Sequence, residues 1–247
     1  MTATAAVVLA SGPGTRLGEL GARMPKTMLP VAGRPYLEHL ATRLLSGGLR
    51  PVVVAVHHLA GTIRDHFADQ PRWANLVLVT TGQRGTGADL LDCLPHVPTD
   101  AFVVCNGDTV VDLDPAALLA FAAHDPDRGV IVLTRRVGVP NEGAFYVAAD
   151  GTVLASLEAD PAPAIPAQFA WQGSSTGVVL LTKPLLARSG PSPPPPSSLE
   201  KTLLPSLIST RHLRAFDNGT RYFLDFGTPE GLEQLGRGAL PLFAGRR

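Results

Sequence analysis

The chain has 247 residues, with 21 basic and 21 acidic side chains, 45% hydrophobic residues and 6% aromatic residues. This composition excludes a disordered chain, and the length suits one large domain whose core needs no disulfide or metal. Balanced charge and few aromatic residues argue against a nucleic-acid surface. The sequence lacks an apolar run of about 18 residues and a secretory leader, so we expect a cytoplasmic protein that contacts no membrane.

The first half alternates between short apolar runs and segments with helical spacing. Leu37, Leu40 and Leu44 recur every three or four residues, as on one face of a helix. The apolar runs predict strands at Ala5–Leu9, Val52–Val56, Leu76–Thr80, Ala101–Cys105 and Val130–Thr134. This order predicts an α/β fold with a Rossmann-like, mostly parallel twisted sheet flanked by helices. Binding residues are expected where these strands end.

The second half reads as a smaller mixed or antiparallel part. Asp150-Gly151 is a hairpin turn signal between two apolar runs, and Ser197 and Glu200 have the spacing of a capping box. The expected strands are Ala144–Val147, Val153–Leu157, Thr176–Leu181 and Tyr222–Phe226, with a helix at Leu199–Ile208. We expect a single domain over residues 1–247, with a nucleotide-binding half (1–130), an acceptor-binding half (131–247) and a flexible proline-rich loop at 189–198.

A glycine-rich turn, Gly12-Pro13-Gly14-Thr15-Arg16, follows the first predicted strand. Such a turn lets backbone amides approach a phosphate group closely. Neither glycine begins a GxxxxGK[ST] P-loop, and Leu17 stands where a GxGxxG dinucleotide motif needs its last glycine. A turn of the form GxGTR therefore remains, and its Arg16 suits phosphate oxygens.

Lys26 follows this turn within a segment that contains Pro25, Pro30 and Pro35, so no regular helix is expected there. An arginine and a lysine beside a glycine turn suit a polyphosphate. Two aspartates stand in apolar surroundings near predicted strand ends, Asp108 and Asp225. Each one alone also suits a cap or a turn, but a pair of carboxylates together with phosphate oxygens suits Mg²⁺.

Eight segments, in this order and spacing, resemble the signature of the sugar-1-phosphate nucleotidyltransferases. They are GPGTR (12–16), PK (25–26), PVAGRP (30–35), RGTGADL (84–90), NGDT (106–109), STG (175–177), SLEK (198–201) and FLDFGTPE (223–230). Within that family the chain is most similar to the D-glycero-D-manno-heptose 1-phosphate and mannose-1-phosphate guanylyltransferases. The resemblance spans almost the whole chain and implies a GT-A-like nucleotidyltransferase fold.

The resemblance also implies the reaction and the residues that perform it. An NTP, with GTP favoured, and a heptose or hexose 1-phosphate would give an NDP-sugar and pyrophosphate with Mg²⁺. The implied catalytic residues are Arg16, Lys26, Asp108 and Asp225, the two aspartates also holding the metal. Nucleotide contacts are implied at Leu9, Ala10, Ser11, Gly12, Gly14, Thr15, Arg16, Gln83, Gly87 and Asn106. Acceptor contacts are implied at Gly143, Glu158, Ser175, Thr176 and Gly177.

The chain departs from the family pattern mainly on the acceptor side. Ser175 replaces an asparagine, and Ala159 replaces a lysine that faces the sugar phosphate. Another cation, Arg135, Arg136 or Lys183, would then serve the acceptor phosphate, or the acceptor is unusual. Alternatives are the same reaction with UTP, CTP or ATP and a cyclitol or other phosphate, and a non-catalytic nucleotide-sugar sensor. The oligomeric state is not readable from the sequence.

Overall fold

The computed structural model describes residues 4–135, 143–159, 161–188 and 196–238. Its strands are β1 Thr4–Leu9, β2 Pro30–Val31, β3 Arg34–Pro35, β4 Leu49–Val56, β5 Leu76–Thr80, β6 Ala101–Asn106, β7 Thr109–Val111, β8 Gly129–Thr134, β9 Ala144–Val147, β10 Val153–Ser156, β11 Trp171–Thr182, β12 Leu213–Asp217 and β13 Phe223–Asp225. Its α-helices are α1 Glu19–Arg23, α2 Tyr36–Ser46, α3 Ala60–Phe67, α4 Thr86–Cys93, α5 Pro115–Ala123, α6 Lys183–Arg188, α7 Leu204–Ser209 and α8 Pro229–Gly238. Short helical turns are η1 Thr15–Leu17, η2 Lys26–Met28, η3 Pro71–Trp73, η4 Leu94–His96 and η5 Leu199–Leu203.

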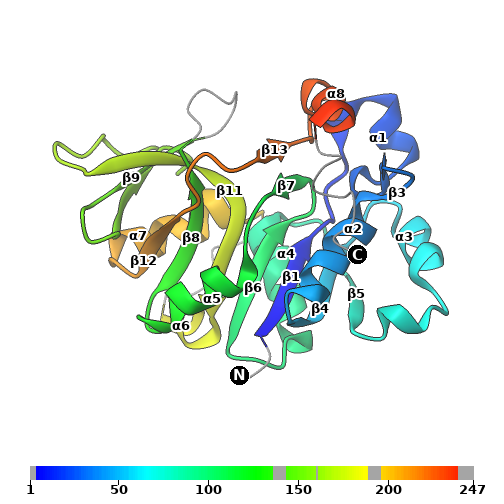
Figure 1. Cartoon of the computed structure of the whole chain (residues 1–247), viewed down its shortest axis with the longest axis horizontal. Helices are drawn as coiled ribbons and strands as arrows, with labels where there is room; N and C mark the ends of the chain where they lie inside the picture. Colours follow the sequence, from blue (N-terminus) through cyan, green and yellow to red (C-terminus); the bar gives the residue numbers. More distant parts are fainter. Residues whose placement is uncertain (1–3, 136–142, 160, 189–195, 239–247) are drawn as a thin grey trace.

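A mixed sheet forms the centre of the molecule (Figure 1). Its main path runs β10-β9-β11-β6-β1-β4-β5, and β8 joins β11 to β12. Four neighbouring strands of this sheet, β6, β1, β4 and β5, are all parallel, while β11 lies antiparallel to β6. The expected parallel sheet and its mixed extension are therefore confirmed.

Helices cover both faces of this sheet, as the near-continuous apolar strands predict. Along β1, Val7 and Leu9 face one core, and Ala6 and Val8 face the other, because successive side chains point to opposite faces. The first core packs against α4, α6 and α7, and the second packs against α2, α3 and α5. Both cysteines are free and buried, and burial raises the pKa of each thiol to about 12.

A second, very small sheet joins the C-terminal part of the described chain to the first half. Strand β13 pairs antiparallel with β7, so that Asp225 lies opposite Thr109. Phe226 donates its backbone N–H to the carbonyl oxygen of Asp108 at 3.0 Å, and its ring meets Tyr36 edge to face at 4.7 Å. This pairing brings together the NGDT and FLDFGTPE segments, which lie more than 100 residues apart in the sequence.

Two local expectations need correction. The helix predicted at Leu199–Ile208 is divided into the π-helical turn η5 and α7, and its cap is Ser198 rather than Ser197. The Ser198 hydroxyl accepts from the Lys201 N–H at 3.1 Å, whereas Ser197 is buried against Gly87.

The part of the chain that the structure describes holds no helix long and apolar enough to cross a bilayer. The proline-rich stretch lies outside it up to residue 195, as does Arg136.

Candidate functional site

The glycine turn after β1 is held in one conformation by close backbone packing. Gly14 has a φ of +66°, which an L side chain rarely adopts, and it begins η1. Gly21 packs directly under it, because a Cβ on Gly21 would overlap the Gly14 carbonyl oxygen. His58 donates from Nε2 to the Gly21 carbonyl at 2.9 Å. The turn is therefore supported from α1 and from the end of β4.

Lys26 and Asp108 form an ion pair directly beside this turn. The lysine comes from η2, and the aspartate follows β6; their side chains are only 15% and 12% exposed. Gly107 lets the backbone before Asp108 pack closely against the end of β1, since a Cβ there would lie 2.8 Å from the Leu9 carbonyl oxygen. A Cβ on Gly12 would lie 3.7 Å from Lys26 Nζ, so the ammonium sits under the glycine turn.

Three of the predicted catalytic side chains converge on Gly227, in the loop between β13 and α8. A Cβ on this glycine would lie 2.9 Å from Asp108 Oδ2, 3.0 Å from Asp225 Oδ1 and 3.0 Å from Arg16 Nη2. The Gly227 N–H donates to Asp225 Oδ1 at 2.7 Å. Arg16, Lys26, Asp108 and Asp225 thus occupy one small region at the carboxyl ends of β1 and β6.

The two aspartates repel each other in this region. Burial raises the pKa of the Asp225 carboxyl above its ordinary value, and the Asp108 carboxylate raises it further. The Gly227 amide, Arg16 and Lys26 oppose that rise in the pKa. Two carboxylates held this close are the arrangement that a bound cation would stabilise.

An open cavity of about 610 Å³ adjoins these side chains on the acceptor side of the sheet. Arg16, Asn106 and Asp225 line the wall nearest the glycine turn. The rest of the lining is Thr109, Gly143, Leu157, Glu158, Ala159, Ser175, Gly177, Glu200, Lys201 and Phe223. Four of the five predicted acceptor residues therefore meet in one cavity with two of the predicted catalytic residues.

Strand alternation explains why the fifth acceptor residue does not face this cavity. Ser175 and Gly177 of β11 line it, while Thr176 between them is fully buried and donates its hydroxyl to the Val132 carbonyl at 2.9 Å. Glu158 Oε1 accepts from the Gly143 N–H at 3.2 Å. Gly143 and Glu158, two of the predicted acceptor residues, are thus in direct contact with each other.

Glu200 and Lys201 also line the cavity, although neither is among the acceptor residues predicted from the sequence. They come from η5, which follows the proline-rich stretch. Their signal in the sequence is the SLEK segment at 198–201, one of the segments that carry the family resemblance. Only the folded chain shows that this segment lines the same cavity as Glu158 and Ala159.

The segment around Gln83 and Gly87, where nucleotide contacts are expected, packs against the second half of the chain. Gly87 donates its N–H to the Ser197 carbonyl at 2.9 Å, so this amide already has a partner. Gln83 is exposed with a φ of +53°, at the turn after β5. Ser11 donates its hydroxyl to Asp89 Oδ2 in the first turn of α4, and Asp89 is 2% exposed. Contacts of Gln83 and Gly87 with a nucleotide remain predictions.

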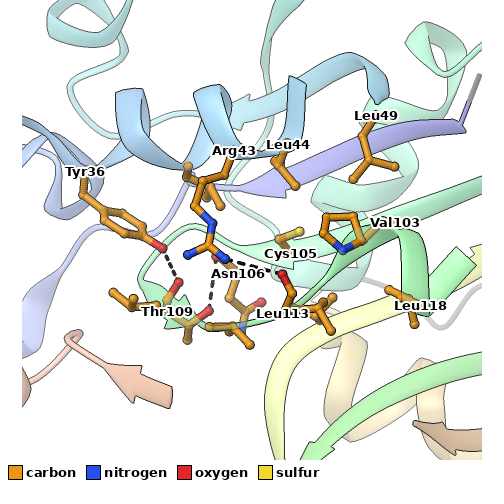
Figure 2. Close-up of a pocket in the computed structure, with 15 residues that line it drawn as sticks. Tyr36, Arg43, Leu44, Leu49, Val103, Cys105, Asn106, Thr109, Leu113 and Leu118 are labelled. Carbon is orange, nitrogen blue, oxygen red and sulfur yellow. Dashed lines mark hydrogen bonds between the residues drawn. The ribbon is translucent and has the colours of Figure 1, made fainter. Parts of the chain in front are cut away.

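A second cavity lies behind Asn106 and has a different character (Figure 2). Its volume is only about 60 Å³ and its lining is mostly apolar. Tyr36 donates its hydroxyl to the Thr109 carbonyl, and Arg43 donates to the Leu113 carbonyl at 3.4 Å (Figure 2). Burial raises the Tyr36 pKa well above its ordinary value. The hydrogen bonds of Tyr36 and Arg43 support the turn after β6 and the segment after β7, and the cavity itself is too small for a nucleotide.

The chain is similar in sequence and in fold to known proteins. The family model described as the MobA-like NTP transferase domain matches residues 6–189. The chain is 29% identical over 245 residues to a mannose-1-phosphate guanylyltransferase of Mycobacterium tuberculosis, covering 96% of this chain and 66% of that protein. It is 50% identical over 133 residues to a CMP-5'-(3-aminopropyl)phosphonate synthase of Streptomyces rubellomurinus, covering 53% of this chain and 20% of that protein.

Among solved structures, HddC from Yersinia pseudotuberculosis superposes with a TM-score of 0.74 at 24% identity, over 95% of this chain and 98% of that one. At this identity the likeness shows the fold. The chain spans 66% of the length of its mycobacterial relative, and 60% of two further guanylyltransferase relatives. The resemblance and the fold class expected from the motifs are both confirmed.

Proposed function

The chain belongs to the MobA-like NTP transferase family, and from this premise we propose that it transfers a nucleotidyl group from an NTP to an anionic oxygen of a phosphorylated or phosphonate acceptor. The observation that carries the proposal is the convergence of Arg16, Asp108 and Asp225 on Gly227, beside Lys26. Two of these side chains, Arg16 and Asp225, also line the cavity that would receive the acceptor.

The nucleotide side provides positive charge and backbone amides for a triphosphate. The amides of the Gly12–Thr15 turn and the Arg16 guanidinium would bind the phosphates that leave as pyrophosphate. Lys26 Nζ lies under the turn, where it would stabilise charge that develops on the α-phosphate. Its ion pair with Asp108 holds the ammonium in place before substrate binds.

The donor set of the site fits Mg²⁺. Asp108 and Asp225 supply carboxylate oxygens around Gly227, and Mg²⁺ in nucleotide sites takes one or two carboxylates with phosphate oxygens and waters. The repulsion that raises the pKa of Asp225 is the charge imbalance that a divalent cation would relieve. When bound, the metal would neutralise charge on the triphosphate.

The reaction needs alignment more than proton transfer. An oxygen of the acceptor phosphate or phosphonate attacks the α-phosphorus, a new P–O bond forms, and the bond to the β-phosphate oxygen breaks to release pyrophosphate. This attacking oxygen is already anionic at neutral pH, so the site requires no strong general base. The cavity would hold the acceptor, with Glu158 and Ser175 at its walls.

For the base and the acceptor, two relatives favour two pairs. The Streptomyces relative at 50% identity favours CTP with a phosphonate, and the mannose-specific relative at 29% identity over nearly the whole chain favours GTP with a sugar 1-phosphate. We propose the CTP–phosphonate pair, because Ala159 and Ser175 alter the acceptor side, and GTP with a heptose or hexose 1-phosphate is the second candidate.

A pyrophosphate-release assay tests the proposal. Four NTPs are each paired with 3-aminopropylphosphonate, mannose 1-phosphate, a heptose 1-phosphate and inositol 1-phosphate, with Mg²⁺ present. We expect release with at least one pair and a fall of about 10²- to 10³-fold in kcat for Lys26→Met. NTP binding without release from any pair would favour the sensor alternative instead. Turnover of Lys26→Met close to the wild type would refute the role of Lys26.

A further inference from the structure

The acceptor cavity contains more acidic than basic side chains. Its described lining includes three acidic side chains, Glu158, Glu200 and Asp225, and two basic side chains, Arg16 and Lys201. An acceptor phosphate or phosphonate would add further negative charge to this cavity. Arg16 stands beside Asp108 and Asp225 at the triphosphate end, so the acceptor end of the cavity depends on Lys201 for positive charge.

The other cations considered for this role are engaged elsewhere. Arg135 forms an ion pair with Asp217 at 2.7 Å and its guanidinium stacks on Trp171 at 4.6 Å from the ring centroid. Lys183 Nζ donates to the Val97 carbonyl at 2.6 Å. Neither residue lines the cavity, and Arg136 lies outside the described residues. Position 159, which lines the same cavity as Lys201, carries only the methyl group of alanine.

The backbone under Lys201 is firmly anchored while its side chain is exposed. Leu199 and Leu203 on either side of it are 2% and 9% exposed. The Ser198 hydroxyl caps the Lys201 N–H, and Glu200 Oε2 accepts from Thr86 Oγ1 at 3.2 Å. Among the described residues Lys201 has no ion-pair partner within 4 Å. The fold therefore places Lys201 at the cavity, where its ammonium can bind an anion.

We propose that Lys201 binds the anionic phosphate or phosphonate group of the acceptor, and that it supplies the positive charge that Ala159 does not. This inference rests on the proposed function and adds a substrate-binding residue to it. An ammonium that contacts the attacking group holds it in line with the α-phosphate, so Lys201 acts at the acceptor-binding step and not at the NTP-binding step.

The electrostatics of Glu158 support this position for the ammonium. Burial and the Glu200 carboxylate raise the pKa of Glu158 to about 7, and Lys201 acts in the opposite direction. The lysine is thus close enough to Glu158 to influence its titration. Replacing Lys201 by methionine should raise the pKa of Glu158 further, which NMR of the side-chain carboxyl can measure without any turnover.

Steady-state kinetics with variants of two positions test the proposal. Lys201→Met should raise the acceptor KM about 10- to 100-fold and leave the NTP KM within about twofold, as expected for one lost charge-assisted bond. Lys201→Arg should recover most of this loss. The double variant Lys201→Met with Ala159→Lys should also recover most of it, because position 159 lines the same cavity.

Arg135→Gln is the matched control, since it removes one positive charge from the same half of the chain outside the cavity. It should leave the acceptor KM unchanged. The acceptor used is whichever compound of the pyrophosphate panel supports the fastest wild-type turnover, and thermal melts confirm that each variant is folded. An unchanged acceptor KM in folded, active Lys201→Met overturns the Lys201 proposal alone. A wild-type chain that releases no pyrophosphate in the whole panel overturns the proposed function, and Lys201 with it.

Discussion

At the scale of single residues, Ser11 and Asp89 form a buried hydrogen bond beside the glycine turn. The Ser11 hydroxyl donates to Asp89 Oδ2. Asp89 is 2% exposed, and its Oδ1 has no hydrogen-bond partner in the described structure. A buried carboxylate without a donor is costly, so the serine is the group that makes this aspartate tolerable.

The first prediction follows from this pair. Ser11→Ala should lower the free energy of unfolding by about 2 kcal/mol, because the buried carboxylate loses its donor. Adding Asp89→Ala should restore part of the loss, since both polar partners are then gone. Urea unfolding of the wild type, both single variants and the double variant gives the coupling energy. Strictly additive effects of the two substitutions would contradict the pairing.

The sequence alone was enough to select the charged residues of the candidate site, but not the residues that pack beside them. Lys26, Asp108 and Asp225 could be selected because charged residues in apolar or stiff surroundings need partners. The Ser11–Asp89 pair could not be selected, since a hydroxyl and a carboxylate 78 positions apart carry no shared pattern. Lys201 belonged to a recognised segment, but its place beside Ala159 depends on tertiary packing.

At the scale of elements, the loop between β13 and α8 sets the geometry of the Arg16, Asp108 and Asp225 cluster. Gly227 in this loop does not have the positive φ that would favour glycine, so its backbone permits alanine. Space is the constraint, because a Cβ would touch Asp108, Asp225 and Arg16 together. A single methyl group at this position would therefore test the whole cluster.

The second prediction is that Gly227→Ala lowers kcat/KM about 10²-fold, because it displaces groups that must be aligned to a fraction of an ångström. The free energy of unfolding should change by about 1 kcal/mol or less. Pyrophosphate release and urea unfolding measure the two effects. Gly61→Ala in α3 is the matched control, as no atom lies within 4 Å of its added methyl group, and its turnover should equal that of the wild type. Full activity of Gly227→Ala would show that the convergence is not needed.

Helices and strands were predictable where the local sequence alone defines them. Asp114 caps the start of α5 by accepting from the Ala116 N–H at 2.9 Å, and aspartate is a residue that favours this position. Strand β5 matches its apolar run from Leu76 to Thr80. The three-residue strand β7 was not predicted, because pairing with β13 from the far end of the chain defines it. Elements that exist only through distant partners lack a local signature.

At the scale of the whole molecule, Glu158 couples stability to pH. Its pKa is about 7 in the folded chain and about 4.5 when exposed, so the folded state binds this proton more tightly. Between these two values the folded chain carries more protons than the unfolded chain, and its stability therefore falls as pH rises. The nearby charges that face Glu158 are Glu200 and Lys201.

The third prediction is that Glu158→Gln removes this dependence. Relative to the wild type, the variant should gain on the order of 2 kcal/mol above pH 7 and gain nothing below about pH 4.5. Thermal melts at pH 4.5, 6 and 8 measure the difference in Tm between the two proteins. Glu19→Gln is the control, since its side chain is 91% exposed in an i,i+4 pair with Arg23. A Tm difference between Glu158→Gln and the wild type that is constant across this range would contradict the assignment.

The strand β11 supports our proposal that both halves form one domain. Over its twelve residues it pairs with β6 of the nucleotide half at Val178–Thr182 and with β9 of the acceptor half at Trp171–Ser174. Its Ser175 and Gly177 line the acceptor cavity between these two pairings. The boundary near residue 130 is therefore a change of sheet character and not a linker.

A strand shared in this way sets the spacing between the two halves. Each residue of an extended strand advances by about 3.3 Å. Strand β8 pairs with β11 on both sides of the irregularity that contains Thr176 and Gly177, at Ser174–Ser175 and at Val179–Leu180. We therefore expect that a change of acceptor during evolution or engineering comes from exchanging the side chains that face the cavity, such as those at positions 159 and 175.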